Sequence, residues 1–130
     1  MTDIRTLVQT VLDTALSASN VRVFWLQKTD TTSADPDEYV VYTIDGNTPT
    51  SYADDAELAR SANIVVRYYY HLDLIDTQPG RTAVKSREQT ILTALKNGGF
   101  SVFNGPFDVG DIDDAGYGTT IYECYFSEVV

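Results

Sequence analysis

Apolar residues recur at helical spacing near the start of the chain, from Ile4 to Leu16, after Thr2 as a plausible N-cap. This pattern predicts a helix over residues 3–18. A second helical pattern spans residues 82–96 and is ended by Asn97-Gly98-Gly99, with Gly98 suited to the left-handed position. Runs rich in β-branched and aromatic residues predict strands at residues 21–27, 39–45, 63–74, 100–103 and 119–129.

Polar and glycine- or proline-containing stretches separate these elements. Residues 29–37 and 46–61 are predicted to be irregular, with one helical turn within 54–60. Gln78-Pro79-Gly80 is a turn signal, Ser86 and Gln89 match a capping box, and Gly105-Pro106 breaks the strand before it. Residues 108–114 are left open as strand or loop.

The predicted element order is α-β-β-β-α-β-β, which favours an α+β fold in one domain over residues 1–130. We expect a mainly antiparallel sheet of four to five strands with both helices packed on one face. In the strand over 63–74, Ile64, Val66 and Tyr68 alternate with the more polar set that includes Arg67 and Tyr69. That alternation is typical of a sheet with one buried and one wetter side.

Charge is unevenly distributed along the chain, which has a net charge of −10. Residues 29–57 contain eight acidic and no basic side chains, and residues 101–130 contain six acidic and none basic. Residues 1–28 and 58–100 carry net charges of +1 and +3. Two interpretations stay open: two solvated acidic loops, or a subunit whose faces differ in sign and pair head-to-tail between copies.

Composition excludes several classes of protein. A 43% hydrophobic content is too high for a disordered chain, and a single cysteine excludes an intramolecular disulfide. No apolar run is long enough to cross a bilayer, and the N-terminus has no signal pattern, so we expect a soluble protein made in the cytosol. The acidic balance argues against a surface that grips duplex DNA.

Candidate catalytic groups are few. His71 and Asp73 share a strand face and could form a hydrogen-bonded pair, but a catalytic dyad would also need a nucleophile or a metal. Cys124 lies on the face predicted to be buried. Gly116 and Gly118 begin a dinucleotide-type motif that lacks its third glycine and precedes a strand, so they are interpreted as turn residues.

Acidic residues at 111–114 invite a calcium-loop interpretation. Asp111, Asp113 and Gly116 match positions 1, 3 and 6 of an EF-hand, but Ala115 and Tyr122 occupy positions that need oxygen ligands. The EF-hand fails. An exposed acidic loop is the default, and a looser divalent site shared between subunits is the alternative. We expect no cofactor and no metal within one subunit.

The chain has nine tyrosines, and adjacent ones in a strand must face opposite sides. Tyr69 and Tyr125 fall on the wetter faces of their strands, where tyrosine is typical of interfaces. Ordinary sheet packing is the alternative interpretation.

Taken together, these features resemble the tail terminator and tail-completion (tail-to-head joining) proteins of long-tailed bacteriophages. The resemblance covers nearly the full length. It rests on the first helix, the YVVY strand at Tyr39–Tyr42 with its irregular acidic loop, and the aromatic strand VVRYYYHL at Val65–Leu72. It also rests on Lys96-Asn97-Gly98-Gly99-Phe100 and on the acidic turn before the last strand, YECYF.

The resemblance implies an assembly role without catalysis. Such proteins form a ring, typically of six subunits, on the head-proximal end of the tail tube. The ring stops tube polymerisation and contacts the head connector, and DNA passes through it. This implies a virion location after assembly in the host cytoplasm, with the tail tube protein and the neck protein as partners and no membrane contact.

The family offers no motif from which interface residues can be copied, so candidates come from charge and from exposed tyrosines. Acidic loops at residues 29–57 or 108–114 are expected to meet a basic side of the neighbouring subunit. The candidate interface residues are Asp54, Asp55, Arg60, Arg67, Tyr69, Arg81, Lys85, Arg87, Asp111, Asp113, Asp114 and Tyr125.

Two alternatives stay open. One is another structural protein of the same particle, such as a tail-tube subunit or a head-closure protein. The other is a small acidic binding module, for example a DNA mimic that occupies a basic partner and loses it in salt. An enzyme is the more distant third.

Overall fold

The computed structural model describes residues 3–26, 36–53, 56–110, 112–113 and 115–129, of which 46–53, 56–60 and 128–129 are described by their backbone alone. Its elements follow the predicted α-β-β-β-α-β-β order, with two short helices added. They are α1 (Ile4–Leu16), η1 (Ser17–Ser19), β1 (Arg22–Trp25), β2 (Glu38–Ala53), β3 (Ala56–His71), α2 (Leu72–Ile75), α3 (Gln78–Asn97), β4 (Ser101–Asp108) and β5 (Tyr117–Val129).

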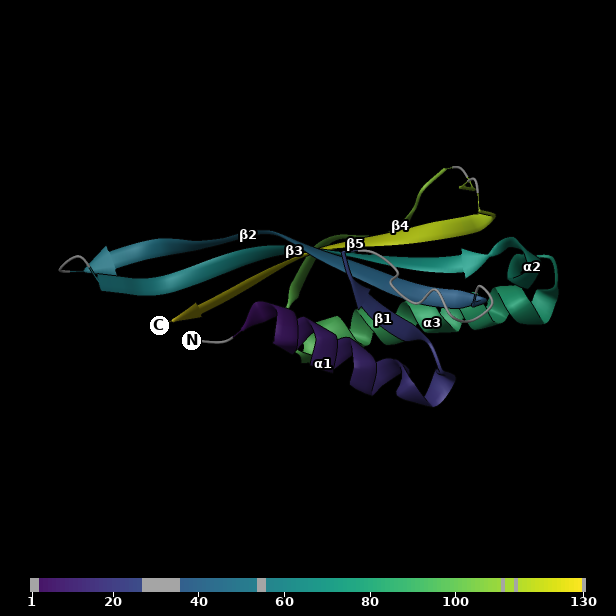
Figure 1. Cartoon of the computed structure of the whole chain (residues 1–130), viewed down its shortest axis with the longest axis horizontal. Helices are drawn as coiled ribbons and strands as arrows, with labels where there is room; N and C mark the ends of the chain where they lie inside the picture. Colours follow the sequence, from purple (N-terminus) through teal and green to yellow (C-terminus); the bar gives the residue numbers. More distant parts are fainter. Residues whose placement is uncertain (1–2, 27–35, 54–55, 111, 114, 130) are drawn as a thin grey trace.

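The strands form one five-stranded sheet in the order β1-β2-β3-β5-β4. The long helices α1 and α3 lie side by side against one face of it, as Figure 1 shows. The α+β class and the one-sided helix layer are therefore confirmed. One pairing differs from the expected antiparallel arrangement, because β1 is parallel to β2. A parallel pair needs a crossover of about a dozen residues, and the stretch 26–37 supplies that length.

The core lies between the helices and the sheet. α1 contributes one buried residue per turn, and α3 contributes Val84, Ile91 and Leu95. The sheet contributes the predicted alternate positions of β3, together with Tyr122 and Cys124 of β5. Full burial of a valine, leucine or isoleucine side chain contributes about 1.5–3 kcal/mol to the stability of the folded state. The principal sequence prediction, which residues face the helices, is confirmed for these strands.

The prediction of an irregular stretch at 46–61 is wrong. β2 continues to Ala53 and β3 begins at Ala56, so the two strands form one long hairpin. Three register shifts, between Ile44 and Tyr52, accommodate the glycine and proline that suggested a loop. In Figure 1 this hairpin extends well beyond the helix layer, and β5 pairs with β3 as far as Ala59–Val129, close to the tip of the hairpin.

The α2–α3 region also differs from the prediction. β3 ends at His71, whose ring nitrogen accepts the Asp73 N–H and caps α2. α3 begins at Gln78 and not at residue 82, because proline is tolerated in a first helical turn and Thr77 caps it. Gly80 is required there, since a Cβ would lie 1.6 Å from the Leu74 carbonyl oxygen.

Smaller corrections concern caps and turns. Asp3, and not Thr2, caps α1 by accepting the backbone N–H groups of Arg5 and Thr6. The left-handed residue after α3 is Gly99 (φ 91°), one position later than predicted. Ser86 and Gln89 lie inside α3, and β4 continues through Gly105-Pro106 to Asp108. From residue 109 the described chain leaves the strand.

Candidate assembly surfaces

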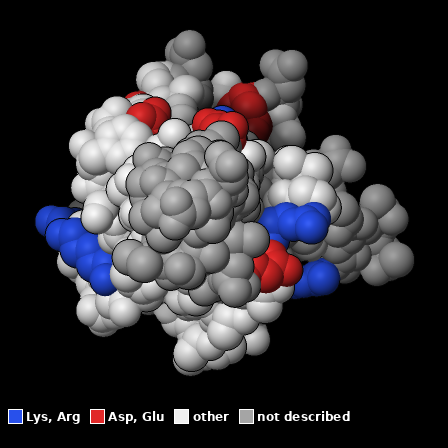
Figure 2. Space-filling model, turned by 90° about the vertical axis from the view of Figure 1, so that its left-hand side faces the viewer, with Lys and Arg blue, Asp and Glu red and all other residues white. Residues whose placement is uncertain are grey.

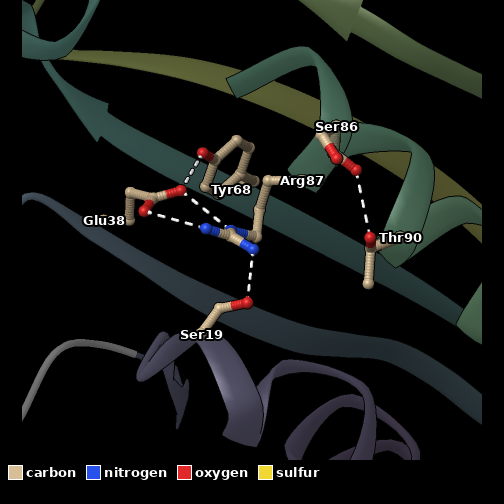
Figure 3. A network of polar contacts seen from close by, with 6 residues as sticks. All are labelled: Ser19, Glu38, Tyr68, Ser86, Arg87 and Thr90. Carbon is tan, nitrogen blue, oxygen red and sulfur yellow. Dashed lines mark hydrogen bonds and ion pairs between the residues drawn. The ribbon is translucent and has the colours of Figure 1, made fainter. Parts of the chain in front are cut away.

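Arg87, a predicted interface cation, forms its polar contacts with residues of its own subunit. Its Nε lies 3.0 Å from Glu38 Oε1, and its Nη1 lies 2.5 Å from Ser19 Oγ. Tyr68 donates its hydroxyl to the same Glu38 carboxylate, as Figure 3 shows. Burial and this hydrogen bond raise the pKa of Tyr68 well above its ordinary value. The network joins η1, β2, β3 and α3, so Arg87 holds the fold together and we drop it as an interface candidate.

Lys85 and Arg81 lie one turn apart on α3, beside a hollow of about 430 Å³. The Arg81 guanidinium donates to the Ile75 carbonyl at 2.8 Å and to Gln78 Oε1 at 3.2 Å. Lys85 is exposed. Of the two, Lys85 is the better placed to meet a partner.

Glu88 and Asp108 also line this hollow. Thr120 donates its hydroxyl to Glu88 at 2.5 Å. Burial, reinforced by the nearby charge of Asp108, raises the pKa of Glu88 although the Thr120 bond opposes the change. Glu88 is therefore a partly desolvated carboxylate on the helix-covered side of the sheet.

Tyr69 and Arg67 lie on the opposite side of β3 from its buried residues, as predicted. Tyr69 stacks on Tyr39 with ring centroids 4.8 Å apart, and Tyr39 meets Tyr117 edge-on at 5.2 Å. Tyr69 is thus half-buried in an aromatic row of its own subunit. Tyr125 leaves 39% of its surface exposed and remains available for contact.

Of the acidic candidates, Asp113 alone has a described side chain. Its Oδ1 accepts the backbone N–H groups of Ala115 at 3.0 Å and Tyr117 at 2.9 Å, so it stabilises the turn before β5. Asp54, Asp55, Asp111 and Asp114 lie outside the described residues. The backbone of Arg60 pairs with Pro49 and Glu128 in the sheet.

The histidine and the cysteine have structural environments. The His71 Nδ1 atom accepts the Asp73 N–H at 3.1 Å, and the Asp73 carboxylate lies 3.4 Å from it. The predicted proximity is confirmed, although Asp73 lies on α2 and not on the strand face. Burial raises the pKa of the Cys124 thiol to about 12. Within the described residues, no three His, Cys, Asp or Glu side chains form a metal-binding group.

Charge-based reasoning missed the outer edge of β1. Arg5 of α1 lies over the Trp25 ring at 4.2 Å, and Arg22 lies over the Phe24 ring at 5.1 Å. Hollows of about 540 and 360 Å³ flank this strand and α1. Residues 1–28 are nearly neutral overall, so a count of charges could not identify this edge as a candidate surface. The sequence signal for it was the combination of Arg22 and Trp25 in one predicted strand.

Seen from the hairpin end, the described charged side chains lie in groups. In Figure 2, Lys and Arg side chains lie on two flanks, and acidic side chains lie along the upper rim and beside the Lys and Arg side chains of the right flank. The separation of the two signs is therefore partial.

Comparison with known proteins places the chain in no established group. No known protein family matches the sequence, and no curated protein is similar to it. No helix in the described part of the chain is both long enough and apolar enough to span a membrane.

Proposed function

We propose that this chain is a non-enzymatic virion assembly protein: a tail terminator that forms a ring on the head-proximal end of a phage tail tube. The observation that carries the proposal is a sheet covered by helices on one face only, with a hairpin extending beyond the helix layer. β5 pairs with β3 as far as Ala59–Val129, so the extending part of the sheet is three-stranded up to that pair and two-stranded only at its tip. A two-stranded ribbon is marginal in water by itself, so the tip fits a segment that is completed by a neighbouring subunit.

In this proposal, the ring stops addition of tube subunits and provides the surface for the head connector. The count of six subunits comes from the family resemblance. DNA passes through the centre without sequence-specific contacts, and the acidic segments repel its phosphates if they line the channel. The partners are further copies of this chain, the tail tube protein and the neck protein.

Head-to-tail contact between unlike surfaces is the mechanism we propose for ring formation. Of the basic candidates, Lys85 is exposed and lines the hollow beside α3. Lys85→Glu tests whether α3 meets an acidic segment of the next subunit, and Lys96→Glu, with the same charge change at the far end of α3, is its control. Equal ring formation by the two variants and the parent would remove this hollow from the interface.

Electron microscopy of particles made by the source virus with this gene deleted tests the function itself. Filled heads beside unattached tails of uncontrolled length are expected for a terminator. Detached tails of normal length would assign the head-joining step instead. Complete virions would contradict both roles and favour the acidic binding module, whereas long tubes formed by the purified chain would make it a tube subunit.

A further inference from the structure

We propose that the tip of the β2–β3 hairpin of one subunit docks on the open face of the sheet of the next subunit, with its acidic residues against Arg67. This inference rests on the proposed ring function and names the two surfaces that form the ring contact. We call residues 50–58 the tip. We call Asn63, Val65, Arg67, Ile121 and Tyr125 the open patch.

Arg67 lies at the centre of the open face. β3 is the middle strand of the five, and Arg67 stands directly opposite Val41 of β2 and Ile121 of β5. Its side chain is half-buried, and both of these neighbours in the register are apolar. Removing a charge from water costs free energy unless an opposite charge compensates it. A cation in this position therefore favours the binding of an anion.

The subunit itself supplies no anion to Arg67. Among the described residues, no side chain forms a hydrogen bond or an ion pair with its guanidinium. Glu123 lies two positions beyond Ile121 on β5, but its Oε2 accepts a hydrogen bond from Asn104 at 3.4 Å. Arg87 differs in this respect, because its guanidinium is paired with Glu38. The guanidinium of Arg67 is thus available to another chain.

The residues around Arg67 form a surface that another chain can cover. α1 and α3 lie against the opposite face of the sheet, as Figure 1 shows. In the open patch, Val65 and Ile121 are half-buried and Asn63 is exposed. Tyr125 leaves 39% of its surface exposed. Tyrosine and arginine are both enriched at protein–protein interfaces, so the composition of the patch fits a contact surface.

The tip has the complementary charge. It contains no lysine or arginine and three acidic residues, which are Asp54, Asp55 and Glu57. Beyond the pair Ala59–Val129 it has no support from β5 and continues as two strands only. Such a ribbon is marginal in water by itself. Docking on a neighbouring subunit therefore stabilises the tip and compensates the charge of Arg67 in a single contact.

The contact is made between copies. Backbone pairs continue along β2 and β3 from Asn63 out to Ala53–Ala56, so the tip points away from the open patch of its own subunit. Figure 1 shows the hairpin extending beyond the helix layer. Because the tip and the patch are different surfaces, the contact is heterologous, and repeated contacts of this kind close into a ring when the rotation permits. One subunit uses its tip for one neighbour and its patch for the other.

Cysteine crosslinking of the full-length chain tests the docking. In the Tyr52→Cys/Asn63→Cys double variant, a short bismaleimide should join the tip of one copy to the patch of the next and give a ladder of covalent oligomers. Within one subunit the two thiols lie about 20 Å apart, because Asn63 pairs with Gly46, six strand residues before position 52. Cys124 is buried, and its raised thiol pKa keeps it unreactive.

Tyr52→Cys/Lys96→Cys is the matched control, because Lys96 is also exposed but belongs to α3, on the opposite side of the sheet. A control ladder as strong as that of the tip–patch pair would overturn the docking, and so would the absence of a ladder from the tip–patch pair. A dimer of the Asn63→Cys single variant, with no ladder from the pair, would mean that the patch packs on its own copy, and would also overturn it.

Charge reversal tests the role of Arg67. Adding Arg67→Glu to the tip–patch variant should reduce the crosslink yield about tenfold, since like charges would then face each other. Adding Asp54→Arg and Asp55→Arg should restore the yield, which a folding defect of the Arg67 variant would not allow. An unchanged yield with Arg67→Glu would overturn the pairing.

The same variants separate this docking from the proposed function. A tip–patch ladder in a protein that does not limit tail length would contradict the terminator function alone. Control of tail length by a protein that gives no such ladder would contradict the docking alone.

Discussion

The helix-covered face of the sheet and its two outer edges use the same residue types for opposite purposes. On the covered face, tyrosine, isoleucine and valine are buried under α1 and α3, and every buried side-chain nitrogen or oxygen atom of the described residues has a hydrogen-bond partner. At the edges, tryptophan, phenylalanine and leucine stay exposed beside charged groups. The covered face folds one subunit, whereas exposed apolar groups at the edges are typical of surfaces that contact other chains.

A core deletion should have the largest effect on the isolated subunit. Ile91→Ala removes a fully buried side chain from α3 and should lower the free energy of unfolding by about 3 kcal/mol. Phe103→Ala, at an exposed position of β4, should change it by less than about 0.5 kcal/mol. Urea unfolding of both variants checks the pair. Equal losses of unfolding free energy in the two variants would mean that the edge stabilises the fold as much as the covered face does, and would contradict the comparison between the two regions.

The next effect concerns Arg87, which joins four elements on the covered side. Arg87→Ala leaves the Glu38 carboxylate without its cation and should cost about 2 kcal/mol of unfolding free energy. Lys85→Ala, two positions earlier on α3 and exposed, is the control and should cost little. A double-mutant cycle with Glu38→Gln measures the coupling free energy between Arg87 and Glu38. A coupling near zero would mean that this ion pair does not stabilise the fold.

The smallest effect is a pH dependence at Glu88. Its pKa in the folded protein is raised, chiefly by burial, above the ordinary value of 4.5, so the folded state favours the protonated acid. The contribution of this group to stability is therefore present below pH 4.5 and is lost as the pH rises through the raised pKa.

Glu88→Gln removes this titration while keeping an acceptor for Thr120. The variant should gain stability relative to the parent near pH 7, and the difference should shrink below pH 4.5. Thermal unfolding across this range checks the prediction, with Glu123→Gln on the open side of β5 as the control. A constant difference at all pH values would contradict it.

The periodicity of apolar residues predicted the covered face well, because side chains that are buried on one face must recur at the period of the strand or helix. The alternation of Ile64, Val66 and Tyr68 and the apolar stripe of α1 follow directly from packing against one layer. The hairpin beyond Ile44 was missed because Gly46 and Pro49 interrupt the strand pattern and are typical of turns. Its backbone pairing and three register shifts are decided by the neighbouring strand.

The candidate site was harder to predict than the fold. Charge counts selected Arg87 as an interface residue. Its guanidinium instead donates to Glu38, 49 positions earlier in the sequence, and this contact forms only because the fold brings β2 and α3 together. The same counts passed over Arg5 and Arg22, because their segment is nearly neutral and their importance comes from stacking on rings at an edge. Sequence spacing does not reveal which strands lie at the edge of a sheet.

Adding the purified chain back to an extract of cells infected with the gene-deleted virus is the most direct test of the central claim. The account predicts that tails then stop at one length and join filled heads. Tails that remain of uncontrolled length after the parent chain is added would contradict it.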